Sequence, residues 1–113
     1  MTPKAALTKA RKACLAIAGV EEKLSHGSPA WFTKKKQFAH FWDNHHGDGE
    51  LCLWLYSDLE IQRALVDGDP DGYFVPPYVG SKGWIGVRLN RELPWEQINA
   101  LIESAEAARR AKK

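Results

Sequence analysis

Four residues in the middle of the chain belong to the types that bind transition metals. His40, Asp43, His45 and His46 form an H-x-x-D-x-H-H pattern, and imidazole and carboxylate groups are ligands for Zn²⁺ and Ni²⁺. The spacing is loose, because His40 is expected on a strand while His45 and His46 fall in a glycine-containing loop. A preformed metal site would require that loop to fold back onto the strand. The pattern therefore favours a solvated loop over a metal centre, and we predict no cofactor.

Side chains that could act as nucleophiles are few and lack partners. Cys14 and Cys52 have no CxxC spacing, and the sequence contains no GxSxG, HExxH, P-loop or GxGxxG motif. Both cysteines are expected to be small buried hydrophobic residues. His26 precedes Gly27 at a predicted turn, where we expect it to bond backbone carbonyls rather than a ligand. These observations predict that the chain is not an enzyme.

A run of three lysines is the first candidate for binding. Lys34, Lys35 and Lys36 stand between two predicted strands, at the expected tip of a hairpin. A solvated tip is the simpler interpretation. In the functional interpretation, the three ammonium groups contact phosphates of DNA.

The second candidate is a group of aromatic residues with one arginine. Trp54, Trp84 and Arg88 are predicted to lie on one face of a sheet, where rings can stack on bases and a guanidinium can pair with phosphate. The same composition suits a protein interface. In a third interpretation, residues 73–80 fold over this face and complete the core. Arg88 either pairs with an acidic neighbour or meets an anion from outside.

The elements that carry these residues can be located from periodicity. Residues 3–18 have helical spacing, with Thr2 as the predicted N-cap and Pro3 in the first turn. Strands are predicted near residues 20–26, 30–34, 37–43, 50–56 and 84–89. Ser57 and Glu60 have capping-box spacing for a short helix that ends near residue 68. Residues 73–80 should be irregular because of two consecutive prolines, and Pro94 opens a final helix.

Alternation along two strands indicates which face meets the helices. Residues 51, 53 and 55 are leucines, while Cys52, Trp54 and Tyr56 point the other way. Ile85, Val87 and Leu89 alternate in the same manner with Trp84, Gly86 and Arg88. The order of elements favours an α+β fold: an antiparallel sheet with helices packed mainly on one face, and N-terminal and C-terminal helices flanking the strands.

Several segments resemble one known family. The segment Phe74-Val75-Pro76-Pro77-Tyr78-Val79-Gly80, followed by Gly83-Trp84-Ile85-Gly86-Val87-Arg88, is similar to the signature of the MmcQ/YjbR family. Ser25-His26-Gly27-Ser28-Pro29-Ala30-Trp31-Phe32 resembles its early strand and turn, and Trp95-Glu96-Gln97-Ile98 resembles the start of its last helix. The resemblance implies a YjbR/CyaY-like fold, similar to frataxin and secretion chaperones, with a suggested double-wing mode of DNA binding. Frataxin-like iron binding has no support, because the first helix is basic.

Composition is consistent with one soluble domain. The 113 residues contain no linker-like stretch, and 44% are hydrophobic, so we predict a single domain over residues 1–113 with a frayed basic tail at about 108–113. No apolar run is long enough to cross a bilayer, and no secretory signal is recognisable at the start. We therefore expect a cytoplasmic protein with no membrane partner. The net charge of +2 gives no global attraction to nucleic acid, so any such binding depends on local clusters of positive charge.

Two hypotheses follow. In the first, the chain is a non-catalytic binding module that binds DNA through the basic hairpin and the aromatic sheet face. In the second, the same face belongs to a protein-interaction or secretion-chaperone-like domain, which could pair with a second copy of itself or with another protein.

Overall fold

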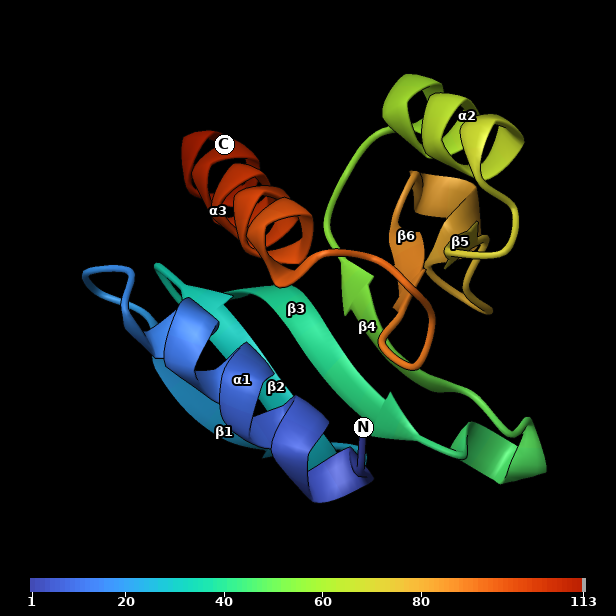
Figure 1. The fold of residues 1–113 in the computed structure, drawn as a ribbon. Coiled ribbons are helices and arrows are strands. Elements are labelled where there is room, and N and C mark those ends of the chain that lie inside the picture. Colours follow the sequence, from blue (N-terminus) through green and yellow to red (C-terminus); the bar gives the residue numbers. More distant parts are fainter. Residues whose placement is uncertain (113) are drawn as a thin grey trace.

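Residues 1–112, which the computed structural model describes, form three α-helices and one six-stranded antiparallel sheet. Figure 1 shows their arrangement, with sheet order β1-β2-β3-β4-β6-β5. The elements are α1 (Pro3–Leu15), β1 (Glu21–Ser25), β2 (Ser28–Thr33), β3 (Lys36–Asp43), η1 (His45–Gly47), β4 (Leu51–Leu55), α2 (Leu59–Gly68), β5 (Tyr73–Phe74), η2 (Gly80–Lys82), β6 (Ile85–Arg88) and α3 (Trp95–Ala111). The predicted α+β class is confirmed.

Local signals account for the first half of the chain. The hydroxyl oxygen of Thr2 accepts a hydrogen bond from the Ala5 amide at 3.1 Å, so Thr2 is the N-cap of α1 as predicted. The β2–β3 hairpin turns through Lys34 and Lys35, whose φ angles are 49° and 66°. Two successive residues with positive φ are typical of a type I′ turn, which matches the twist of the flanking strands.

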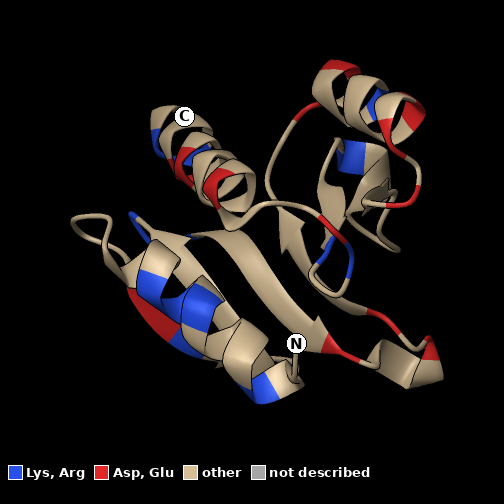
Figure 2. Ribbon diagram, viewed as in Figure 1, with Lys and Arg blue, Asp and Glu red and all other residues tan. Residues whose placement is uncertain are grey.

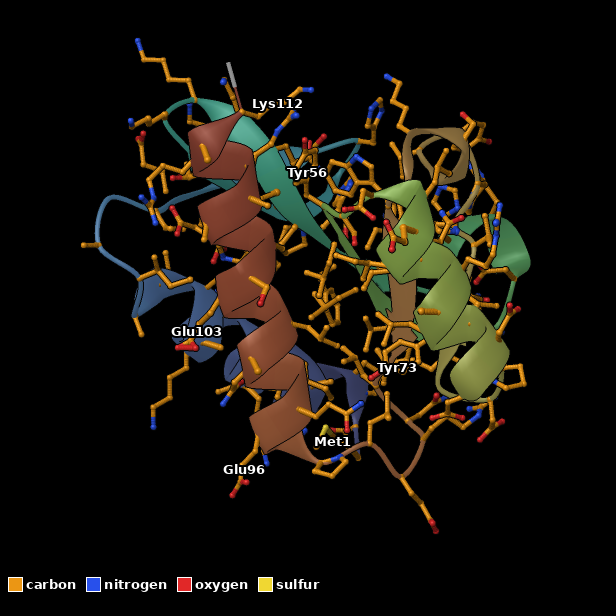
Figure 3. All side chains as sticks on the ribbon, turned by 90° about the horizontal axis from the view of Figure 1, so that it is seen from above. Met1, Tyr56, Tyr73, Glu96, Glu103 and Lys112 are labelled. Atoms are coloured by element: carbon orange, nitrogen blue, oxygen red, sulfur yellow. The ribbon has the colours of Figure 1, made fainter. Side chains whose placement is uncertain are left out.

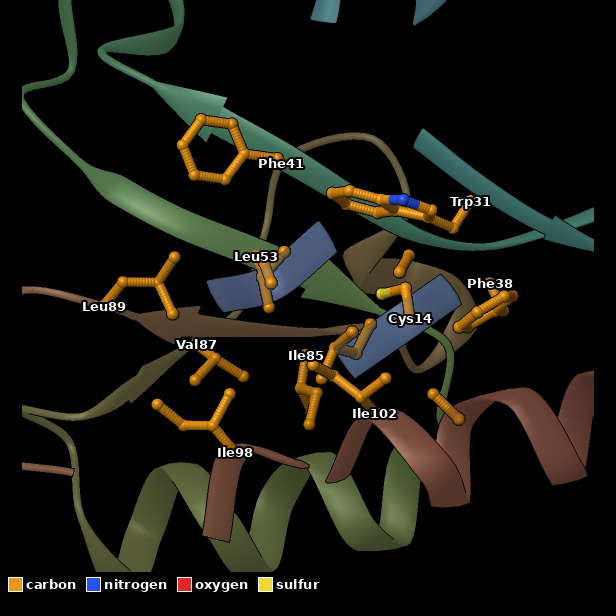
Figure 4. Close-up of a cluster of buried hydrophobic side chains, with 14 of the residues drawn as sticks. Cys14, Trp31, Phe38, Phe41, Leu53, Ile85, Val87, Leu89, Ile98 and Ile102 are labelled. Atoms are coloured by element: carbon orange, nitrogen blue, oxygen red, sulfur yellow. The ribbon is translucent and has the colours of Figure 1, made fainter. Parts of the chain in front are cut away.

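One face of the sheet carries the main core. α1 and α3 pack on this face (Figure 1), and α2 packs against the same core through Leu65 and Val66. The alternation predicted for β4 and β6 is confirmed, because their aliphatic residues belong to this core. Figure 4 shows how side chains from α1, α3 and the central strands meet there. Among the largest fully buried members are Trp31, Phe38, Leu53, Ile85, Val87, Ile98 and Ile102.

The other face of the sheet carries a smaller aromatic cluster. We call it the second-face cluster; it consists of Trp42, Cys52, Trp54 and Trp84, with Phe74 and Val79 packed against it. α2 lies beside β5 and β6 (Figure 1). The Gln62 side chain of α2 donates to the carbonyls of Gly80 and Trp84 at 2.8 and 2.6 Å. These bonds fix the 75–84 segment, which covers part of this face.

Three details differ from the sequence-based expectations. The predicted capping box is wrong, because Asp58 rather than Ser57 caps α2, accepting from the Ile61 amide at 2.8 Å. The segment expected to be irregular begins with a short strand, β5, paired with β6. α3 continues to Ala111, so the helix extends into the segment predicted as a tail. Lys113, the last residue of the predicted tail, lies outside the described residues.

Gly86 is required by a close approach between β6 and β5. A Cβ atom added there would lie 2.4 to 2.6 Å from the ring of Phe74. We predict that Gly86→Ala lowers the free energy of unfolding by roughly 1–3 kcal/mol, because the ring must move in a packed environment. Urea denaturation measures this effect. Gly68→Ala is the matched control, since its added Cβ meets nothing within 4 Å; equal midpoints for both variants would contradict the prediction.

Candidate functional site

The predicted hairpin lysines lie beside the end of α3. The ammonium group of Lys36 donates to the backbone carbonyl of Lys112, whereas Lys34 and Lys35 are exposed. Figure 3 shows Tyr56 and Lys112 toward the same end of the molecule. We call this region the basic end; its cationic residues are Lys34, Lys35, Lys36, Arg109, Arg110 and Lys112. Two segments far apart in the sequence therefore build one positively charged region.

A buried carboxylate holds the basic end together. Glu106 is 3% exposed and accepts hydrogen bonds from the Thr33 hydroxyl at 2.7 Å and from the Arg110 guanidinium at 2.9 Å. Burial alone would raise the pKa of Glu106, but the bonds from Arg110 and Thr33 and the charge of Lys34 outweigh burial and lower that pKa. Glu106 thus neutralises Arg110 and ties α3 to β2. Lys34 and Lys35 have no ion-pair partner within the described chain.

Trp54, Trp84 and Arg88 do not form the exposed surface that one of the expectations described. Trp54 and Trp84 are 5% and 6% exposed within the second-face cluster. Arg88 donates to the Glu50 carboxylate at 2.6 Å and to the carbonyls of Pro70 and Asp71 at 3.1 Å. Its guanidinium also lies 4.7 Å from the centre of the Phe74 ring. The covered face is therefore the interpretation that holds, and these three residues do not form an exposed surface for DNA.

A pocket remains open on the same face of the sheet. Its volume is about 460 Å³, and we call it the His–Trp pocket. Its wall contains all four histidines of the sequence together with three indoles. The lining residues are Ser25, His26, Gln37, His40, Trp42, His45, His46, Trp54, Tyr78, Val79 and Trp84.

Strand pairing brings the floor of this pocket together. His40 and Trp42 share one face of β3, and His40 pairs directly with Trp54 of β4. The ring centroids of His40 and Trp42 are 4.2 Å apart. The imidazole Nε2 of His40 lies 2.9 Å from the carbonyl oxygen of Ser25, so His40, and not His26 as predicted, bonds the β1–β2 turn. Period-2 alternation was the sequence signal that could have grouped His40, Trp42 and Trp54.

The loop between β3 and β4 supplies the remaining imidazoles. Asn44 accepts from the Gly49 amide through its side chain at 2.8 Å, and its own amide donates to the Glu50 carbonyl at 2.7 Å. These bonds close the loop and place the His45 ring 4.1 Å from the ring of Trp42. The loop that the sequence suggested to be freely solvated thus contributes one wall of the pocket.

Burial controls the charge state of the pocket. It lowers the pKa of His40 to about 4, and the charges of His26 and His45 act in the same direction. The pKa of His45 is also lowered, first by burial and then by the charge of His46. His40 is therefore a neutral imidazole near pH 7. The indole Nε1 of Trp42 is buried and has no hydrogen-bond partner.

Within residues 1–112, no three His, Cys, Asp or Glu side chains lie close enough to hold a metal ion. Cys14 and Cys52 are free and buried, and burial raises the pKa of both thiols, that of Cys52 to about 12. In the same part of the chain, none of the helices has both the length and the apolar character needed to cross a membrane.

Comparison with known proteins identifies the family. The YjbR family model matches residues 15–105. The chain belongs to the YjbR family. No curated protein matches it. A crystal structure of the Deinococcus radiodurans protein DR2400, with family-model domain DUF419, is similar to this YjbR chain with a TM-score of 0.81. The two share 19% identity, and the match covers 98% of this chain and 83% of the other, so the likeness shows the fold. The resemblance inferred from the sequence motifs is confirmed.

The lowered pKa of His40 predicts a pH-dependent stability. In the unfolded chain His40 has its ordinary pKa of 6.5, whereas in the folded chain its pKa is about 4. Stability is therefore lost as pH falls through this window, by an amount on the order of 3 kcal/mol. Urea denaturation between these pH values measures the loss. His40→Gln should flatten the profile, and an unchanged slope in that variant would contradict the assignment.

Proposed function

We propose that this YjbR-family chain is a non-catalytic binding module that binds DNA through the basic end. The observation that carries the proposal is the meeting of the Lys34–Lys35 turn with the C-terminal turns of α3, joined through Glu106 and Lys36. Acidic residues lie on α2 and the loops beside it, and also on β1, the β3–β4 loop and α3 (Figure 2). A positively charged surface that is carried by two rigid elements suits contacts with phosphates.

The roles within the basic end differ. Lys34 and Lys35 are exposed at a tight turn and are assigned to phosphate contacts. Lys36 and Arg110 are assigned to positioning, because they bond Lys112 and Glu106. The β2–β3 hairpin would serve as one projecting wing in a double-wing mode of binding. Trp54, Trp84 and Arg88 are assigned to the fold.

Two observations support a non-catalytic module, and a third supports a cytoplasmic location. The thiols of Cys14 and Cys52 are held in the protonated form by burial, so neither is an activated nucleophile. No carboxylate is among the residues that line the His–Trp pocket. Two unpaired cysteines also suit a reducing compartment.

A second candidate function is protein interaction. Four large apolar side chains are exposed on α2 and the 75–78 segment: Leu59, Ile61, Val75 and Tyr78. If this surface docks a second copy of the chain, light scattering should show a mass that rises toward a dimer with concentration, and Ile61→Glu should abolish the rise. A constant monomer mass for both proteins would remove the homodimer alternative.

The DNA proposal predicts a specific loss on removing the turn lysines. Lys34→Ala combined with Lys35→Ala should weaken binding to duplex DNA and reduce the slope of log affinity against log salt by about 2, since each lost phosphate contact removes nearly one unit. A salt titration by fluorescence anisotropy measures both quantities. Arg63→Ala combined with Lys82→Ala is the control, because it removes the same charge from exposed positions on α2 and η2. Equal losses in the two variants, or no binding by the unaltered protein at low salt, would refute the proposal.

A further inference from the structure

We propose that the His–Trp pocket is a separate site for a small aromatic anion, meaning a molecule of one or two fused rings that carries a carboxylate. This inference goes beyond the DNA proposal, because none of the six cationic residues of the basic end lines the pocket. Three properties of the pocket support it: its walls, an unused hydrogen-bond donor and its charge.

The walls of the pocket suit a flat ring. Trp42, Trp54 and Trp84 are three of the eleven lining residues, and the ring centroids of Trp42 and Trp54 are 5.1 Å apart at a tilt of 46°. Aromatic ligands gain from such offset and edge contacts in addition to the burial of apolar area. A volume of about 460 Å³ falls in the range of small-molecule pockets.

The unused donor is the indole N–H of Trp42. Trp42 is 8% exposed, and its Nε1 has no partner in the folded chain. A buried donor without an acceptor costs about 1–3 kcal/mol. The ring of His45, near the start of the β3–β4 loop, lies edge-on beside this indole, with the two ring centroids 4.1 Å apart. If the His45 ring turned aside, a ligand oxygen would enter and accept a hydrogen bond from the Trp42 indole N–H. This bond would remove the cost of the unpaired donor.

The charge of the pocket suits an anion rather than a cation. Its lining contains four imidazoles and no Asp, Glu, Lys or Arg. The charged neighbours of His45 are His46, Asp48 and His26, and those of His40 are His26 and His45. An anion in the pocket would favour the protonated form of His45. Because the pKa of His45 in the folded chain is lowered from its ordinary value of 6.5, binding should tighten as pH falls below about 6.5.

Titration with 2-naphthoate tests the site, with the neutral 2-naphthamide as the matched probe. In the ¹H–¹⁵N spectrum, 2-naphthoate should shift the indole N–H signal of Trp42 while leaving that of Trp95 in place. The amide should bind at least tenfold more weakly at about pH 6, because a charged acceptor forms the stronger bond. Absence of any shift in the Trp42 signal would overturn the site, and equal affinities for the two probes would overturn its preference for anions.

Substitutions separate this site from the basic end. Trp42→Phe keeps an aromatic ring but removes the donor, and should weaken 2-naphthoate binding about tenfold. Trp95→Phe on α3 is the control for the same chemical change outside the pocket. His45→Gln should remove the tightening at low pH. The Lys34→Ala, Lys35→Ala protein should bind 2-naphthoate normally, so failure of the DNA proposal leaves this test intact. Unchanged binding by a folded Trp42→Phe protein would refute the role of the indole.

Discussion

The fold depends on a central sheet that is apolar on both faces. Because side chains alternate along β3 and β4, Ala39 and Phe41 of β3 and the leucines of β4 point to the helices, while Trp42 and Trp54 point to the opposite side. α1 and α3 pack on the first face, and Leu65 and Val66 of α2 pack against the same core. The second face cannot remain in water with three indoles exposed, so another part of the chain must cover it. That constraint accounts for the 73–84 segment, which has little regular structure of its own.

Individual residues in the covering segment can be understood from this requirement. Phe74 lies directly on Gly86, and the guanidinium of Arg88 stacks on the outer side of the same ring. Arg88 is then close enough to Glu50 to form a half-buried ion pair. Gln62 completes the attachment by bonding two carbonyls that no strand satisfies. The cover extends over β4 and β6 but stops short of β3, and the His–Trp pocket is the space that remains.

Much of the fold could be predicted from the sequence, because its signals are local. The Thr2 cap, the alternation of leucines along β4 and the turn at Lys34 and Lys35 each depend on a few neighbouring residues. The capping of α2 was mispredicted because Ser57 and Asp58 are adjacent candidates, and only the path of the chain selects Asp58. The sequence could predict that Arg88 pairs with an acidic residue. It could not identify Glu50 as the partner, because Glu50 lies 38 residues away in sequence.

The pocket was harder to foresee, because its members come from five separate segments. His26 and the His45–His46 pair lie in turns whose direction depends on positive φ angles, at 51° for His26 and 50° for His46. Nothing in the sequence pattern fixes which way such turns project. The residue types within residues 40–46 are those of metal ligands, although their loose spacing favoured a solvated loop. In the folded chain, Asp43 is exposed and lies outside the pocket, while the imidazoles face indoles contributed by other strands.

Strand β3 connects the two candidate sites. Lys36 at its start bonds the end of α3 in the basic end, while Gln37, His40 and Trp42 along the same strand line the pocket. β3 is hydrogen-bonded to β2 on one side and to β4 on the other, so it cannot shift without breaking both ladders. The sheet therefore holds the two sites at a constant separation. A ligand bound as proposed would contact the β3–β4 loop through His45 and leave the position of the lysine turn unchanged.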